Sequence, residues 1–196
     1  MIRFLLAFVM LPTLLWADTF PALYDVTGVA SDDVLNIRAE ATASAETIGA
    51  LAHNSSNVEV IATAGNWGQI NSDEGTGWVS LRYMARQASN PDYALAHRIG
   101  CYGTEPFWSA EFVQGQKVQF SSPEGGYETT GAGLVVPASG VTGLWAMAFD
   151  DSVATFRREI CSDGMSDRQF GLSVALYSHH AGEIALYSGC CSITGY

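Results

Sequence analysis

The sequence predicts an all-β protein with two small antiparallel domains, of which the second is stapled by disulfide bonds. Short runs of β-branched and aromatic residues recur between turn clusters, and the chain holds 20 glycines that suit such turns. No stretch keeps a sustained helical period. All four cysteines lie in the second half of the chain, so covalent cross-links are expected in the second domain.

The first residues have the organisation of a secretory signal peptide. MIRFLLAFVMLPTLLWA carries one positive charge at Arg3, an apolar run over residues 4–16 and the small residue Ala17 at its end. A transmembrane helix is the competing interpretation, but the run is short for a bilayer and Pro12 interrupts it. We therefore expect residues 1–17 to be cleaved, the mature protein to be periplasmic or secreted, and no membrane span to remain.

The charge of the mature chain limits the classes of partner. Without Arg3 the chain has 8 basic and 20 acidic residues, which gives a net charge of −12. Nucleic acids and anionic lipids bind proteins through clustered lysine and arginine side chains. The composition therefore argues against both as partners.

The four cysteines are expected to form two disulfide bonds, because an even number in an exported chain normally pairs. A bond between the neighbours Cys190 and Cys191 would be strained, and consecutive strand residues point to opposite faces, so each is expected to have a distant partner. We favour Cys161 with Cys190 and Cys101 with Cys191, although the sequence alone does not separate the three connectivities. A zinc site of four thiolates is the alternative, and the adjacent pair has the wrong ligand spacing for it.

The stretch from residue 24 to residue 84 predicts a meander of very short strands. VLNIR, VEVIA, WGQI and GWVS are separated by the turn clusters ATASAET, AGN and SDEGTG. At this size a small closed barrel is the economical way to bury such strands.

LNIRAEATASAETIGAL, VEVIATAGNWGQI and TGWVSLRYM together resemble the bacterial SH3-like domain. They match the family's Leu-Asn-x-Arg strand, its central tryptophan before an alternating strand, and its closing Gly-Trp-Val. We place this domain at residues 18–85. The resemblance implies an exported β-barrel that often targets a protein to the cell envelope, in some members by binding peptidoglycan peptides, and it implies no chemistry.

The resemblance also implies roles for individual residues. Asn36 and Arg38 would brace the turn between neighbouring strands. Trp67 and Trp78 have two interpretations, an exposed ligand platform or core packing, and their large apolar area favours core packing. Four positions would belong to the core: Leu35, Ile37, Val60 and Val79.

The polar segment RQASNPDYALAHR, residues 86–98, contains an Asn-Pro turn and is predicted to link the two domains. Over residues 99–196, WSAEF, KVQF, LWAMAF, VATF, FGLSVALY and EIALY alternate apolar with polar residues and predict about seven or eight antiparallel strands. Alternation is the same in a barrel and in a sandwich, so both folds stay open. LYSHHAGEIALYSG predicts a hairpin with HHAG as its connection.

Three motifs of the second domain, GTEPFW, CSDGMSDR and a terminal GCC, resemble a group of uncharacterised bacterial envelope proteins and lipoproteins. In that group GTEPFW opens the domain and CSDGMSDR precedes its last hairpin. The resemblance covers residues 99–196. It implies an envelope location without naming an activity.

The CSDGMSDR segment, residues 161–168, has a structural and a functional interpretation. In the structural one, Asp-Gly forms a left-handed turn, the following serine and aspartate cap backbone N–H groups, and the cysteine ties the segment to the last strand. In the functional one, side chains of this segment and of GTEPFW converge on a polar pocket with an aromatic wall. The candidate binding residues of this domain are Glu105, Trp108, Asp163, Ser166, Asp167 and Arg168. Trp67 and Trp78 are the candidates of the first domain.

We expect a binding or accessory protein rather than an enzyme, with no cofactor or metal, because no catalytic constellation is recognisable. His179 and His180 face apart on a predicted strand, which disfavours a metal site. The predicted function is an envelope-associated protein whose SH3-like module targets a cell-wall peptide or glycan or an envelope protein, and whose second domain binds a small ligand or peptide. The alternative is a cell-wall hydrolase in which paired carboxylates such as Glu105 and Asp163 would carry out glycoside hydrolysis.

Overall fold

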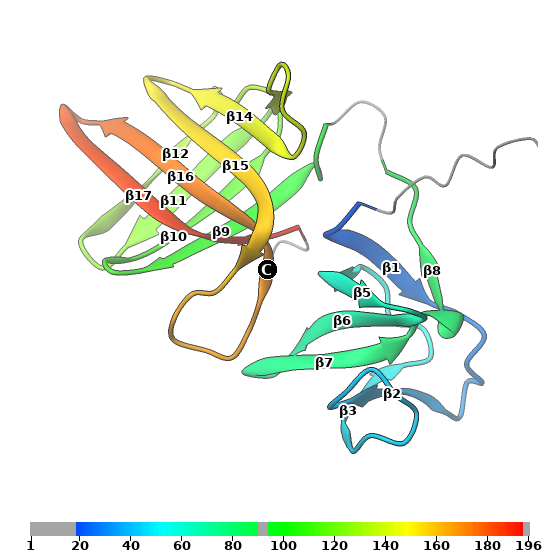
Figure 1. Ribbon diagram of the computed structural model, residues 1–196. Coiled ribbons are helices and arrows are strands. Elements are labelled where there is room, and N and C mark those ends of the chain that lie inside the picture. The colour runs from blue at the N-terminus through cyan, green and yellow to red at the C-terminus, as the bar shows by residue number, and fades with distance from the viewer. Residues whose placement is uncertain (1–18, 90–93, 194–196) are drawn as a thin grey trace, which may run out of the picture.

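The computed structural model describes residues 19–89 and 94–193, which form two all-β domains with one short 3-10 helix (Figure 1). The predicted signal peptide, residues 1–17, lies outside the described residues. Within the described ranges, no helix is long and apolar enough to cross a membrane. Each domain has its own hydrophobic core, and the strands of the two domains belong to different sheets.

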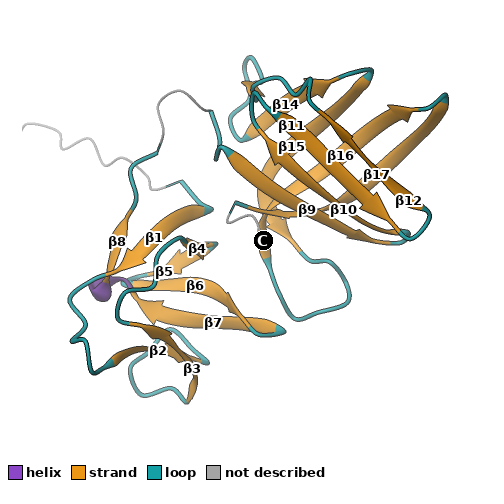
Figure 2. Cartoon of the chain, turned by 180° about the vertical axis from the view of Figure 1, so that it is seen from behind, coloured by secondary structure: helices purple, strands orange, loops and turns teal. Residues whose placement is uncertain are grey.

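The N-terminal domain packs two small antiparallel sheets over a shared core (Figure 2). One sheet has the order β4-β1-β8 and the other β3-β2-β7-β6-β5. Its elements are β1 Ala22–Val26, β2 Val34–Arg38, β3 Thr47–Ala52, β4 Val58–Val60, β5 Ala62–Ala64, β6 Trp67–Ser72, β7 Gly75–Ser80, the 3-10 helix η1 Leu81–Tyr83 and β8 Met84–Arg86.

The core of the N-terminal domain follows the alternation of its strands. In β2 two side chains are buried and their neighbours are not, as period-two alternation requires. The four positions implied by the SH3-like resemblance are confirmed as core members, namely Leu35, Ile37, Val60 and Val79. Arg38 braces the turn after β2, because its Nη1 donates to the Ala45 carbonyl at 3.0 Å and to the Thr47 hydroxyl at 2.8 Å.

The C-terminal domain is one nine-stranded antiparallel sheet with the order β12-β11-β10-β9-β17-β16-β15-β14-β13. The last strand of the chain, β17, therefore lies inside the sheet and pairs with both β9 and β16. Its elements are β9 Arg98–Thr104, β10 Phe107–Val113, β11 Lys117–Ser122, β12 Gly125–Thr129, β13 Val136–Pro137, β14 Leu144–Phe149, β15 Ser152–Cys161, β16 Phe170–His180 and β17 Glu183–Ser192.

This sheet is curled into a half-barrel (Figures 1 and 2). Phe112 of β10 lies 5.9 Å from Phe149 of β14 and 5.2 Å from Phe156 of β15, measured between ring centroids, although these strands are not neighbours. The Tyr127 hydroxyl of β12 lies 3.0 Å from the Ser178 hydroxyl of β16. The inward side chains of one sheet therefore meet each other and form the core. Of the two folds that the sequence left open, the structure shows neither two packed sheets nor a closed barrel, but a single curled sheet.

The hairpin between β16 and β17 has a shorter connection than HHAG. His179 and His180 belong to β16 and pair with β17. The turn consists of Ala181 and Gly182, which have φ values of 52° and 86°. Positive φ at both central residues matches the right-handed twist of the flanking strands. The predicted connection was wrong because the ladder continues through both histidines.

The disulfide bonds join Cys101 to Cys191 and Cys161 to Cys190, which is the pairing favoured from the sequence. Cys101 and Cys191 face each other across β9 and β17 and belong to the hydrophobic core. The other bond lies on the outer face of the sheet and holds the beginning of the 161–168 segment against β17.

The two domains contact each other where β17 ends. The buried carboxylate of Glu59 in β4 accepts hydrogen bonds from the Ser192 hydroxyl and from the Ile193 backbone N–H, the latter at 3.1 Å. A Cβ atom added at Gly171 would lie 2.7–2.8 Å from the ring of Pro21, which precedes β1. Glycine at this position therefore allows the Pro21 ring to pack directly against the backbone of β16.

Candidate functional site

The 161–168 segment is a folded loop held together by one carboxylate. Asp163 Oδ1 accepts hydrogen bonds from the backbone N–H groups of Met165 and Ser166, each at 3.0 Å, and both carboxylate oxygens accept the Ser166 hydroxyl. Partial burial acts to raise the pKa of Asp163, but these hydrogen bonds and the charge of Arg168 outweigh it and lower that pKa. Gly164 has a φ of 73° and completes the turn.

The loop is fixed to the half-barrel at its first residues. The Cys161–Cys190 bond ties it to β17. The Thr104 hydroxyl at the end of β9 donates to the Asp163 carbonyl at 3.0 Å. Both anchors come from central strands of the sheet, so the loop has a rigid base.

The other side of the loop docks on the turn between β6 and β7 of the N-terminal domain. The Asp167 backbone N–H donates to the Glu74 carbonyl at 2.9 Å, and Arg168 Nε donates to the Asp73 carbonyl at 2.5 Å. The Arg168 guanidinium and the Glu74 carboxylate are 3.8 Å apart, but the Glu74 side chain is 86% exposed, so this ion pair adds little.

Asn71 and Gln169 extend this docking by a reciprocal pair of hydrogen bonds. The Asn71 side chain donates to the Gln169 carbonyl at 2.8 Å and accepts from the Gln169 backbone N–H at 3.1 Å. Gln69 adds a side-chain bond to Gln169 at 3.3 Å. The loop therefore connects the two domains, which supports its structural interpretation. It is anchored on the N-terminal domain as well as on the half-barrel.

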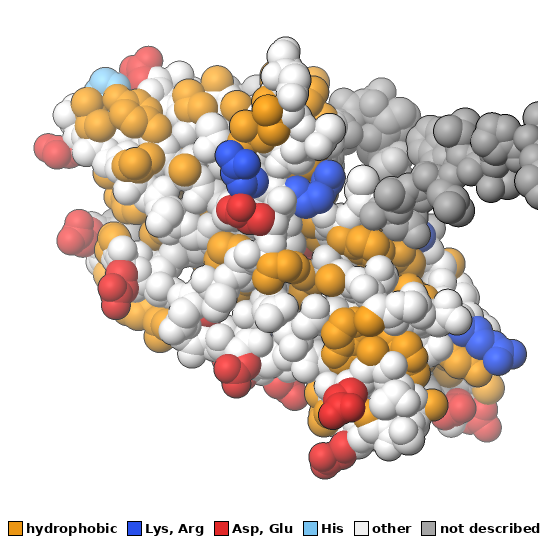
Figure 3. Space-filling model, viewed as in Figure 1, with side chains coloured by type: hydrophobic (Ala, Val, Ile, Leu, Met, Phe, Trp, Pro, Cys, Tyr) orange, Lys and Arg blue, Asp and Glu red, His pale blue; other side chains and the backbone are white. Residues whose placement is uncertain are grey.

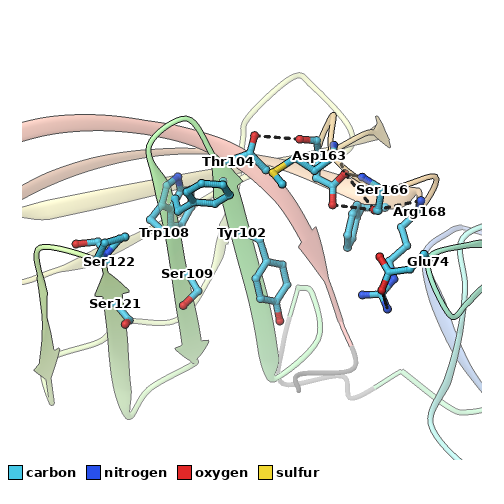
Figure 4. A pocket seen from close by; sticks show the side chains of 15 residues that line it. Glu74, Tyr102, Thr104, Trp108, Ser109, Ser121, Ser122, Asp163, Ser166 and Arg168 are labelled. Atoms are coloured by element: carbon cyan, nitrogen blue, oxygen red, sulfur yellow. Dashed lines mark hydrogen bonds and ion pairs between the residues drawn. The ribbon is translucent and has the colours of Figure 1, made fainter.

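A cleft of about 750 Å³ lies between this loop and the outer face of the half-barrel (Figure 4). Tyr102, Ser109 and Ser121 project outward from β9, β10 and β11 and form one wall. The loop forms the opposite wall, and Glu74 of the N-terminal domain stands at its end. Both domains therefore contribute to one cavity.

Four of the six candidate binding residues of the C-terminal domain line this cleft: Trp108, Asp163, Ser166 and Arg168. Glu105 instead lines a neighbouring groove of about 600 Å³ over β15, β16 and β17, which Asp163 also reaches. Asp167 lines neither of these two cavities, and its backbone N–H bonds instead to the Glu74 carbonyl.

Trp108 contributes little aromatic surface to the cleft, although it has a large ring. The side chain is only 5% exposed, and its indole stacks on Phe120 inside the half-barrel with ring centroids 5.9 Å apart. Its Nε1 donates to the Ser188 carbonyl at 3.3 Å. The aromatic surface of the cleft comes instead from Tyr102, Phe107 and Phe170, of which Phe107 is 55% exposed.

Sequence reasoning missed several of the lining residues. Alternation along β9 and β10 places Tyr102 and Ser109 outward, and this signal was available once the strands had been predicted. Glu74 gave no signal, because only the docking of the two domains brings it to the cleft. Met165, which is 66% exposed, stands out as an apolar residue in an otherwise polar loop.

Trp67 and Trp78 lie on the outer face of the sheet formed by β6 and β7. Trp78 pairs with Gln69, and Trp67 pairs with Ser80, so the two indoles are diagonal neighbours on one face. Both side chains are half-buried, and neither belongs to the core cluster. The expected core packing was wrong because Ile70 and Val79 occupy the inward positions of these strands.

The arrangement suits binding by stacking and hydrogen bonding. The cleft offers aromatic rings, serine hydroxyls, one carboxylate and one guanidinium, which together can orient a small polar molecule with an apolar face. Among the described residues, no group of three His, Cys, Asp or Glu side chains is placed to hold a metal ion.

Comparison with known proteins gives one match. Residues 33–85 match the family model of the bacterial SH3 domain. Neither the search of curated proteins nor the search of solved structures gave a match. The resemblance suggested for residues 99–196 stays a hypothesis. The match covers strands β2 to β7 and most of β8, whereas β1, which completes the smaller sheet, precedes it. Residues 33–85 of this chain therefore form a bacterial SH3 domain.

Proposed function

We propose that this protein is an exported, envelope-associated binding protein in which the SH3 domain targets the cell wall or an envelope partner and the interdomain cleft holds a small ligand or peptide. The observation that supports this most is the cleft itself, because residues of both domains line it. A ligand in the cleft would contact the targeting module and the half-barrel at once.

The targeting role rests on the SH3 domain and on its outer face. Bacterial SH3 domains are generally cell-wall binding modules. Trp67 and Trp78 present two half-buried indoles side by side, and aromatic faces of this kind stack on sugar rings and peptide groups. The acidic charge of the chain favours a neutral or basic target over an anionic polymer.

A binding role is preferred to catalysis because the Asp163 carboxylate is already engaged. Its oxygens accept hydrogen bonds within the loop, and its lowered pKa makes it a weak proton acceptor. The rival function, a cell-wall hydrolase, is favoured by one observation: Glu105 and Asp163 line the same groove. Release of soluble wall fragments by the wild type, abolished in Glu105→Gln, would replace the binding proposal.

The targeting role is tested by co-sedimentation of the mature protein with purified peptidoglycan sacculi. We expect the wild type to sediment and Trp67→Ala and Trp78→Ala to stay largely in the supernatant. Tyr83→Ala is the matched control, because Tyr83 is an exposed aromatic residue of the same domain outside this face. If the wild type also stayed in solution, wall targeting would fail, and capture of a protein from an envelope extract would become the leading test.

A further inference from the structure

Strand β17 extends beyond its partner β9. Their ladder ends where Cys190 pairs with Tyr102, because β9 stops at Thr104 and the chain turns back into β10. Among the described residues, the part of β17 from Glu183 to Ser188 therefore pairs with β16 alone, and we call this part the open edge. Figures 1 and 2 agree that the turns of the β9–β10 and β16–β17 hairpins lie apart. Both hairpins are described without a gap, and the function proposed above does not use the open edge.

The open edge presents backbone groups in a defined pattern. Trp108 Nε1 donates to the Ser188 carbonyl at 3.3 Å, and a Cβ atom added at Gly103 of β9 would lie 2.7 Å from the same oxygen. The backbone groups of Ser188 therefore point away from β16. In an antiparallel strand this direction alternates, so residues two apart point the same way. The N–H and C=O groups of Leu186 and Ile184 thus also point to the open edge.

The outer face of the sheet beside the open edge is apolar. Because side chains of a strand alternate, Leu186 and Ile184 share the outer face with Cys190. Their side chains are 73% and 63% exposed. Leu186 pairs with Tyr177 of β16, which pairs in turn with Val153 of β15. Figure 3 shows apolar side chains gathered over this end of the half-barrel. An exposed apolar strand edge of this kind is a template for the pairing of a further strand.

Acidic side chains adjoin the open edge where it meets the groove of about 600 Å³ over β15, β16 and β17, which Ser188 also lines. Among the described residues, the charged lining of this groove consists of three acids and one base, namely Glu105, Glu159, Asp163 and Arg157. The whole chain is acidic as well, with 20 acidic and 9 basic residues. A second copy of the chain would bring a surface of like charge to the edge. A partner with basic residues is therefore favoured over self-pairing.

We propose that the open edge of β17 binds an extended, basic peptide segment of a partner protein by strand addition. The backbone of the segment pairs with Ile184 and Leu186, so that the half-barrel sheet gains a short strand there. Apolar residues at alternate positions of the segment pack beside the two exposed side chains, because alternate residues of a strand share a face. A basic end of the segment lies over the acidic groove.

The test is amide hydrogen exchange in the mature full-length protein, with and without a synthetic probe peptide. In the probe, valine and threonine alternate after a pair of lysines, and in a matched peptide glutamates replace the lysines. Without peptide we expect fast exchange at Ile184 and Leu186, whereas Ala185 and Tyr187, whose amides face β16, are protected. The saturating basic probe should slow exchange at Ile184 and Leu186 by at least about tenfold. The acidic peptide should bind more weakly at low ionic strength.

A substitution separates the backbone contact from the side-chain contact. Leu186→Pro removes an N–H donor of the open edge without removing a hydrogen bond to β16. We expect it to weaken binding of the basic probe by about tenfold, as measured by isothermal titration. Leu186→Ala keeps the donor and should weaken binding less. Val141→Ala, at a 51% exposed apolar residue in a turn away from this edge, is the matched control and should bind as the wild type does.

The proposal is wrong if the basic probe leaves exchange at Ile184 and Leu186 unchanged, whether or not the probe binds elsewhere. Slow exchange at these two amides that appears without peptide and increases with protein concentration would identify a second copy of the chain as the occupant instead. Equal affinity for the basic and acidic peptides would contradict the charge argument. Should Leu186→Pro not fold, the exchange measurement on the wild type decides alone.

Discussion

Cys190 and Cys191 are adjacent in β17, yet their side chains lie on opposite faces of the sheet and form two bonds of different character. Cys191 bonds with Cys101 inside the core. Cys190 bonds with Cys161 on the outer face, where the interdomain loop begins. One bond therefore stabilises the half-barrel, and the other fixes the position of its neighbour domain.

The two disulfide bonds should differ in what their removal changes. We expect Cys101→Ala with Cys191→Ala to lower the free energy of unfolding by about 2–5 kcal/mol, because the closed loop is long and the bond is buried. Cys161→Ala with Cys190→Ala should lower the free energy of unfolding by less and should expose the 161–168 loop to proteases. Thermal unfolding and limited proteolysis check this. Equal protease resistance of the loop in both double variants would contradict the anchoring role.

Asn71 should couple the domains. In Asn71→Ala the Gln169 backbone loses both partners at the interface, and we expect a loss of about 1–3 kcal/mol in the interaction between the domains. Calorimetric unfolding should then separate into two transitions. Asn54→Ala, which alters an exposed asparagine in a turn of the same domain, is the control and should unfold as the wild type does. A single unchanged transition in Asn71→Ala would show that the reciprocal pair is dispensable.

Glu59 should make stability fall as the pH rises. Burial raises the pKa of Glu59 above its ordinary value of 4.5, and the hydrogen bonds from Ser192 and Ile193 offset only part of this effect. The folded pKa is higher than the unfolded one, so the contribution of the group is full below the unfolded pKa and is lost as the pH rises through the folded pKa.

The measurement is the unfolding midpoint between about pH 4 and about pH 8. Glu59→Gln should be more stable than the wild type at the upper end of this range and should flatten the profile. Glu46→Gln, at an exposed carboxylate, should follow the wild type. A wild-type profile that Glu59→Gln leaves unaltered would exclude Glu59 as the group responsible.

Asp163 should act in the opposite direction. Its pKa is lowered, so its contribution to loop stability is present above the unfolded pKa and is lost as the pH falls through the folded pKa. We expect the backbone amides of Met165 and Ser166 to exchange hydrogen faster on acidification, relative to their intrinsic rates. In Asp163→Asn they should exchange faster even at neutral pH. Protection that persists in this variant would assign the turn to its backbone alone.

Tyr102 should determine affinity in the cleft. If soluble wall fragments bind there, Tyr102→Ala should weaken binding by about tenfold, which is the loss expected for one aromatic contact of about 1.4 kcal/mol. Tyr177→Ala is the control, because Tyr177 is 42% exposed on β16 and does not line the cleft. Isothermal titration of both variants measures the difference. Equal affinity in both would place any bound fragment elsewhere.

Local rules predicted most of the fold. Period-two alternation gave the strands and the inward positions such as Ile37 and Val79, because side chains of a strand must point alternately to its two faces. The same rule separated Cys190 from Cys191 and so disfavoured a bond between these two neighbours, but it did not choose between the two pairings that remained, of which the structure shows one. The residues at which a hairpin turn begins and ends were harder to predict. HHAG was expected to connect β16 and β17, but strand pairing continues through both histidines.

The candidate site was only partly predictable because it depends on contacts between distant parts of the chain. Gln69 and Gln169 are separated by 100 positions, and no local pattern indicates that they meet. Glu74 lines the cleft although it was not predicted, and Glu105 lines the neighbouring groove although it was predicted for the cleft. Both positions depend on how distant segments pack together. Trp108 was predicted to be a binding residue because it belongs to the GTEPFW motif. Its side chain instead packs in the core and only borders the cleft.

The central place of β17 has a consequence for biosynthesis. During vectorial synthesis the strands β9 to β12 and β13 to β16 emerge first, but no ladder joins these two halves until β17 is available between β9 and β16. The half-barrel therefore closes only after translation of its last strand. Because Cys190 and Cys191 both lie in that strand, neither of the two disulfide bonds can form before it is present. Until then the edges of β9 and β16 lack the partner that β17 supplies, and unpaired strand edges of this kind favour aggregation.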